Sequence, residues 1–142
     1  MIGYFDASAL VKRYVAESGS DMVRNLLGEC LACTSRLSEV EIASALVRRA
    51  RDGSISEADR GRALSALTGD LDILYVVELT PQIATLARLL LPQHRLRAND
   101  AIQLASCIFV QESTGTTVTF VASDHELNRA AARVGLRLSP AG

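Results

Sequence analysis

The fold is decided by Thr116-Thr117-Val118-Thr119-Phe120-Val121-Ala122-Ser123-Asp124. The first seven residues of this stretch are β-branched, aromatic or small and apolar, and Gly115 and Ser123 bound them, which predicts a strand over 116–122. A near-continuous apolar strand is typical of a parallel sheet that is covered on both faces. An acid, Asp124, follows this strand after a single residue.

Outward from this strand, the chain alternates short apolar runs with helical patterns. Further strands are expected over 2–5, 30–34, 73–79 and 136–138. One helix is expected directly after Asp6, a second over 22–27 and a last one over 127–134. Four more are expected to begin at Ser35, at Ser56, at Thr80-Pro81, and at Asn99 or a neighbour. Strands that alternate with helices predict an α/β fold. We expect a three-layer α/β/α sandwich with a central, mainly parallel sheet of four to five strands, as one domain over 1–142.

Composition narrows the class of protein. The chain has 142 residues, a formal net charge of −1 and 49% hydrophobic residues, so it is globular and does not coat nucleic acid by bulk charge. Three cysteines without a signal peptide argue against a disulfide framework. No apolar run is long enough for a membrane span. We therefore expect a cytoplasmic protein with no membrane partner.

Four acids lie in apolar surroundings. Asp6 ends the first strand and Asp124 follows the strongest one, so both belong to the sheet edge where open parallel sheets bind ligands. Asp100 lies at a helix start, and Glu41 lies within an apolar helix. Converging carboxylates repel one another unless cations neutralise them, and they suit Mg²⁺ or Mn²⁺. The sequence therefore predicts a divalent-metal site at this edge.

Each acid also has a structural interpretation. Asp6 and Asp124 could be helix N-caps, and Asp100 could be a first-turn acid that the helix dipole favours. Glu41 could be a solvated helix residue. Periodicity does not choose between Glu39 and Glu41, because this helix is apolar on several faces.

Four short motifs in order resemble the PIN-domain ribonucleases, and most closely the VapC toxins of prokaryotic toxin–antitoxin pairs. The motifs are Tyr4-Phe5-Asp6-Ala7-Ser8-Ala9-Leu10-Val11-Lys12, Thr34-Ser35-Arg36-Leu37-Ser38-Glu39-Val40-Glu41, Arg97-Ala98-Asn99-Asp100-Ala101 and Val121-Ala122-Ser123-Asp124. The likeness covers nearly the whole chain.

The resemblance implies a Mg²⁺-dependent endoribonuclease, with Mn²⁺ as a substitute, that hydrolyses phosphodiester bonds in transfer or ribosomal RNA. Asp6, Glu41, Asp100 and Asp124 would be its catalytic acids, and Asp6, Asp100 and Asp124 would hold the metal. Ser8 would orient Asp6, and Ser123 occupies a position where the family often has Thr or Ser. Arg36 and Arg97 are candidates for phosphate contacts, whereas Lys12 and Arg13 fit solvated surface charge better. The resemblance also implies a VapB-like antitoxin partner that blocks the acidic groove, and a homodimer.

Other functions are weighed against this one. The alternatives are a catalytically inactive PIN-like binding module and a PIN nuclease that acts outside a toxin–antitoxin pair or on DNA. Cys30 and Cys33 have the CxxC spacing of redox proteins, but alternation along a strand would turn the two thiols to opposite faces. His94 and His125 fit surface and first-turn positions better than a catalytic base.

Overall fold

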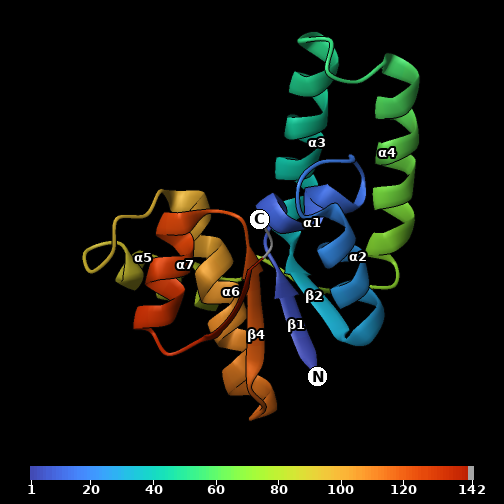
Figure 1. The fold of residues 1–142 in the computed structure, drawn as a ribbon. Helices are drawn as coiled ribbons and strands as arrows, with labels where there is room; N and C mark the ends of the chain where they lie inside the picture. The colour runs from blue at the N-terminus through green and yellow to red at the C-terminus, as the bar shows by residue number, and fades with distance from the viewer. Residues whose placement is uncertain (141–142) are drawn as a thin grey trace.

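The computed structural model describes residues 1–140, and its centre is a five-stranded sheet in the order β3-β2-β1-β4-β5. The strands are β1 (Ile2–Phe5), β2 (Leu31–Ser35), β3 (Tyr75–Val77), β4 (Val118–Ala122) and β5 (Arg137–Pro140). All four neighbouring pairs are parallel. The expected α/β fold with a central parallel sheet is confirmed (Figure 1).

Helices connect the strands and begin largely where the sequence predicts. They are α1 (Ala7–Leu10), followed by a 3₁₀ turn at Val11–Arg13, α2 (Ser20–Glu29), α3 (Arg36–Arg51), α4 (Glu57–Leu71), α5 (Pro81–Leu90), α6 (Ala98–Thr114) and α7 (His125–Arg133). The side chains of Ser35, Ser56 and Thr80 accept backbone N–H groups at the starts of α3, α4 and α5. Pro81 occupies the first turn of α5, where its missing N–H costs little.

Two apolar cores cover the two faces of the sheet. Tyr4 and Phe120 point to one face, where their rings stack 5.8 Å apart and pack with α5, α6 and α7. Phe5 and Val121 point to the other face, where they pack with α1 to α4. Successive strand residues thus serve opposite cores, which explains why the strands are apolar throughout. The three layers expected from the sequence are present.

Several boundaries differ from the sequence prediction. β4 begins at Val118 and not at Thr116, and β2 and β5 are each displaced from the expected 30–34 and 136–138 by one or two residues. β3 covers only Tyr75–Val77 of the expected 73–79, because Ile73 lies in a turn and is 85% exposed. The helical pattern after Asp6 contains one α-turn and then a 3₁₀ turn. Arg97, not Asn99, is the N-cap of α6, which leaves the Asn99 side chain free to contact another element.

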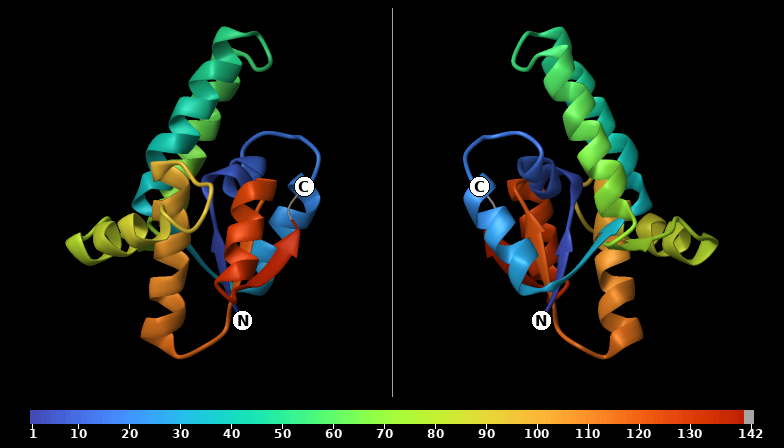
Figure 2. Two further views of the ribbon diagram at one scale, coloured as in Figure 1. Left: turned by 90° about the vertical axis from the view of Figure 1, so that its left-hand side faces the viewer. Right: turned by 90° about the vertical axis from the view of Figure 1, so that its right-hand side faces the viewer.

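The sheet order places a topological switch point between β1 and β4. From this pair the chain continues outward to β2 on one side and to β5 on the other, and ligands of open α/β sheets bind beyond the carboxyl ends of strands at such a point. Both candidate strand-end acids, Asp6 and Asp124, lie there. By contrast, α3 and α4 form a pair that extends well beyond the sheet (Figures 1 and 2). No helix within residues 1–140 is long and apolar enough to cross a membrane.

Candidate active site

Asp6 is the most buried acid at the switch point, with 4% of its surface exposed. Its carboxylate accepts hydrogen bonds from the Ser8 hydroxyl at 2.7 and 2.9 Å and from the Ala9 backbone N–H at 3.0 Å. Burial raises the pKa of Asp6 from 3.8 to about 7, although these hydrogen bonds lower it, and Glu41 raises it further. Asp6 is both the N-cap of α1 and a carboxylate whose charge is poorly compensated in the metal-free protein.

Ser8 links Asp6 to the end of β4. While its hydroxyl donates to Asp6, its oxygen accepts the backbone N–H of Ser123 at 2.9 Å. The Ser123 hydroxyl in turn lies 3.5 Å from the Ser8 carbonyl. The position of the Asp6 carboxylate is therefore tied to both central strands, as the expected orienting role of Ser8 requires.

Glu41 is held against α6 by two amide side chains. Asn99 Nδ2 donates to one carboxylate oxygen at 2.9 Å, and Gln103 Nε2 donates to the other at 2.8 Å. Glu39 instead forms an ion pair with Arg36 at 3.2 Å on the outside of the helix. The choice that periodicity left open is resolved by geometry: Glu41 faces the other acids and Glu39 does not.

Gln103 is a residue of this site that the sequence interpretation missed. It is 2% exposed, and its Oε1 accepts the buried Tyr4 hydroxyl at 2.6 Å. Because that acceptor is occupied, Nε2 is fixed as the donor to both Glu41 and the Ser38 hydroxyl, the latter at 3.0 Å. The only available signal was a polar residue between Ile102 and Leu104, one turn after Asn99.

The network continues into the sheet. The Thr34 hydroxyl lies 2.7 Å from Ser38 Oγ and 2.6 Å from the Phe5 carbonyl, the residue before Asp6. Side chains from β1, β2, α3 and α6 therefore form one buried polar chain that ends on the Glu41 carboxylate. Such fully connected networks hold one geometry rigidly.

Asp100 and Asp124 complete the group of acids. Burial is the main cause that raises the pKa of Asp100, and both Asp124 and Glu41 raise it too, against a hydrogen bond from the Arg97 backbone. Asp124 is exposed, and its Oδ1 accepts the Leu127 N–H at 2.9 Å as the N-cap of α7. Asp124 is therefore a helix cap that also lies near Asp100, and its role as a metal ligand stays a prediction.

The acids fit a divalent cation by their chemistry. They influence one another electrostatically, and a cation would relieve the burial penalty on Asp6 and Asp100. Among residues 1–140, however, no three His, Cys, Asp or Glu side chains are close enough to form a ready metal cage. Mg²⁺ does not need such a cage, since it keeps several waters and takes one or two carboxylates together with substrate phosphates.

The basic residues considered for phosphate contacts differ in whether they already form ion pairs within the protein. Arg36 forms ion pairs with Glu78 at 2.6 Å and with Glu39, so its guanidinium is already neutralised. Arg97 lines the hollow that holds Asp100 and Asp124. Lys12 was expected to be solvated surface charge, and this prediction is wrong: Lys12 is 8% exposed and pairs with Glu17. Arg13 remains partly exposed and pairs with Asp70.

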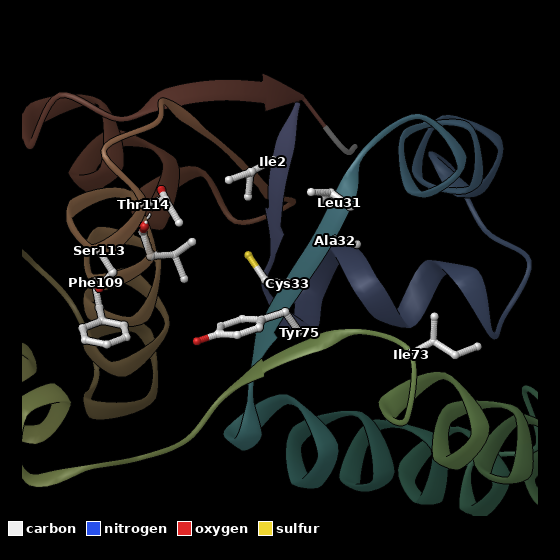
Figure 3. A pocket seen from close by; sticks show the side chains of 10 residues that line it. Ile2, Leu31, Ala32, Cys33, Ile73, Tyr75, Phe109, Ser113 and Thr114 are labelled. Atoms are coloured by element: carbon white, nitrogen blue, oxygen red, sulfur yellow. Dashed lines mark hydrogen bonds between the residues drawn. The ribbon is translucent and has the colours of Figure 1, made fainter.

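An apolar hollow of about 380 Å³ lies at the opposite edge of the sheet (Figure 3). It is lined by the first residues of β1, β2 and β3, which are Ile2, Leu31 and Tyr75, and by Phe109 of α6. It contains no acid and lies away from the strand ends that carry Asp6 and Asp124, so it is not the hydrolytic site. Cys33 lines it, whereas Cys30 packs on the other face of the sheet, as alternation predicts.

Sequence comparisons identify related proteins. The family model described as "PIN domain" matches residues 3–133. Two curated relatives from strains of Mycobacterium tuberculosis, "Ribonuclease VapC45" and "Ribonuclease VapC49", are each 33% identical over 139 residues, which is 97% of this chain and 94% of theirs.

Solved structures share the fold. FitAcB from Neisseria gonorrhoeae has a TM-score of 0.69 at 13% identity, covering 97% of this chain and 96% of that one. VapC20 from M. tuberculosis, a "Sarcin-Ricin loop cleaving toxin", has a TM-score of 0.67 at 18% identity over 90% and 94%. VapBC2 from Rickettsia felis, bound to a promoter DNA fragment, has a TM-score of 0.67 at 14% identity, covering 99% of this chain and 98% of that one. At these identities the structures support the fold alone. With the family model and the two curated relatives, the chain belongs to the PIN-domain family and, within it, to the VapC ribonucleases.

Proposed function

We propose that this protein is a Mg²⁺- or Mn²⁺-dependent endoribonuclease that acts as the toxin of a toxin–antitoxin pair. The observation that carries the proposal is that burial raises the pKa of both Asp6 and Asp100 near the ends of β1 and β4, and that Glu41 raises both values further, as Asp124 does for Asp100. Membership of the VapC ribonucleases supports the substrate class. The relative VapC20 is named for cleaving the sarcin–ricin loop, which makes structured ribosomal RNA one candidate substrate and transfer RNA the other.

Each residue has a distinct task in the proposed reaction. Asp6, Asp100 and Asp124 would hold the cation, which when bound supplies a water of lowered pKa and neutralises charge on the phosphate. Ser8 and the Ser123 backbone fix the Asp6 carboxylate. Gln103 and Asn99 fix Glu41, which would orient a water by hydrogen bonding. Arg97, at the wall of the same hollow, would contact a phosphate oxygen.

We further propose a VapB-like antitoxin as the partner. Several solved structures with this fold are complexes, among them "Toxin-antitoxin complex from Klebsiella pneumoniae", with a TM-score of 0.65. On this chain, Val40 of α3 and Leu64 of α4 are 65% and 37% exposed on the projecting helix pair. These apolar side chains would suit an amphipathic segment of the antitoxin. A homodimer remains a prediction from the family.

The test is cleavage of total RNA by the full chain freed of any partner, in Mg²⁺, Mn²⁺ or EDTA. Asp6→Asn and Asp100→Asn are the test variants, and Asp21→Asn is the control, because Asp21 is an exposed acid of α2. We expect discrete fragments that need metal and disappear only in the two test variants. A metal-dependent rise in melting temperature that both variants lose would report binding independently of cleavage. Intact RNA under every condition would support the inactive binding module instead.

A further inference from the structure

Two hollows meet beside α7 and form one continuous surface. The first contains Asp100, Asp124 and Arg97. The second contains Arg129 and Arg133 of α7. His94, Arg95 and Glu126 line both, so the second hollow begins where the acids end. In Figure 1 the loop between α5 and α6, which carries residues 91–97, lies beside α7.

Charge changes sign along this surface. Asp100 and Asp124 dominate the end near the strands, whereas Arg95, Arg129 and Arg133 outnumber the single acid, Glu126, at the far end. Arg129 Nη1 lies 3.1 Å from the Glu126 carboxylate, but both side chains are more than half exposed, so this ion pair is weak and a phosphate can compete for the guanidinium. Within residues 1–140, Arg95 and Arg133 have no ion pair. The far end therefore carries excess positive charge that the fold does not use.

The same wall holds an unused hydrogen-bonding group. Both ring nitrogens of His94 are buried and have no hydrogen-bond partner in the described part of the chain. Buried polar atoms nearly always have a partner, so this imidazole marks a place where the free protein is incompletely satisfied. A ligand with acceptor oxygens would match the arginine forks.

We propose that Arg95, Arg129 and Arg133 hold the phosphates of an RNA strand that flank the bond cut at the acids. The inference rests on the proposed function and adds the direction in which the substrate leaves the site. A polyanion fits this surface, because the two hollows form an open groove that several phosphates could follow. With a net charge of −1, the protein has no bulk attraction for RNA, so affinity must come from a local surface such as this one.

The experiment measures binding, not cleavage. A fluorescein-labelled single-stranded RNA is titrated with the full chain in EDTA, by anisotropy, at several salt concentrations. The test variant is Arg129→Gln/Arg133→Gln and the control is Arg62→Gln/Arg51→Gln. Arg62 pairs with Asp59 three residues earlier, as Arg129 pairs with Glu126, and Arg51 and Arg133 both lie in the last turn of a helix. The two variants therefore change net charge and helix stability alike.

Each phosphate contact on a single strand contributes about 0.7 to the slope of log affinity against log salt. Losing two contacts should lower this slope by about 1.4. If the variant and the wild type bind alike at 1 M salt, the variant should then bind roughly 25-fold more weakly than the wild type at 0.1 M salt. Adding Arg95→Gln should lower the affinity for RNA at 0.1 M salt by about a further fivefold. The control should match the wild type.

Equal affinity of the test and control variants for RNA would overturn the inference while leaving the nuclease proposal intact. Unchanged RNA binding together with weakened binding of the antitoxin would overturn it too, and would make the surface a protein interface. If wild-type protein neither binds nor cleaves RNA, the proposed function fails together with the inference. Cleavage by wild type, measured separately in Mg²⁺, distinguishes these cases.

Discussion

The replacement Asp6→Asn should stabilise the metal-free protein while abolishing cleavage. Asp6 is 4% exposed, and burial raises its pKa to about 7 despite hydrogen bonds from Ser8 and Ala9. Asn keeps the cap, because its side-chain oxygen can still accept the Ala9 N–H, and Asn caps helices as well as Asp. The variant removes a buried negative charge and keeps nearly the same shape.

The magnitude follows from the two pKa values. In the unfolded chain the Asp6 pKa is near 3.8, and in the folded protein it is about 7. Between these values the folded state binds more protons than the unfolded state, so the free energy of unfolding falls as pH rises. One pKa unit corresponds to about 1.4 kcal/mol, so the loss reaches a ceiling of about 4 kcal/mol above pH 7. Asn carries no charge and avoids this loss.

Urea unfolding in EDTA at pH 4.5, 6, 7 and 8 measures the effect. We expect the stability advantage of Asp6→Asn to grow with pH and to level off above pH 7. Asp124→Asn is the matched control: Asp124 also caps a helix, but it is exposed, so its removal should give no comparable gain. Saturating Mg²⁺ should stabilise the wild type and leave Asp6→Asn unchanged, which would narrow the difference.

A variant that is no more stable than the wild type at pH 8, or an advantage that does not change with pH, would refute the reasoning. Either result would mean that the protein compensates the Asp6 charge by a route other than the hydrogen bonds described. The control prevents a general effect of lower negative charge from being mistaken for relief of this one carboxylate.

Three further variants test the surrounding residues. Gln103→Leu should lower stability by about 1–3 kcal/mol, because the buried Tyr4 hydroxyl loses its acceptor, and should reduce cleavage, because Glu41 loses one of its two amide donors; urea unfolding and RNA assays would show both, and an unchanged protein would contradict the network. Ser8→Ala removes a hydrogen bond that lowers the Asp6 pKa, so the acidic limb of the cleavage rate should move to higher pH; an unmoved limb would separate Ser8 from Asp6. Arg36→Gln should change stability by less than about 1 kcal/mol, since its ion pairs with Glu78 and Glu39 are exposed. A fall in RNA cleavage by this variant would support the phosphate contact, and unaltered cleavage would assign Arg36 to the ion pairs alone.

Local sequence was enough to predict the layers of the fold. Strands such as Val118–Ala122 serve a core on each face, so their composition alone identifies them. Caps such as Ser35 act on neighbouring backbone, so their position is also local information. β3 was predicted too long because apolar residues at an exposed turn, notably Ile73, look like strand residues in the sequence.

The site was only partly predictable, because its contacts span the chain. Asp6 and Asp124 were predicted as strand-end acids without any knowledge of their partners. Periodicity did not separate Glu41 from Glu39, and only the family resemblance favoured Glu41, since the contacts that hold it come from Asn99 and Gln103, about sixty residues away. Gln103 was missed for the same reason. Its role depends on Tyr4, which lies 99 residues earlier.

The arrangement explains how one fold can tolerate an unstable group of charges. The acids lie at the one edge where backbone from β1 and β4 ends side by side, so the sheet core is not disturbed by them. Around them the polar groups are mutually satisfied: Ser8 binds Asp6 and the Ser123 N–H, and Gln103 binds Tyr4, Ser38 and Glu41. What remains uncompensated is charge, and it is concentrated on Asp6 and Asp100. Although Ser8 and Ala9 already donate to Asp6, its pKa stays at about 7, and a cation would relieve the burial penalty directly. The uncompensated charge on Asp6 and Asp100 therefore favours the cation that the proposed reaction needs.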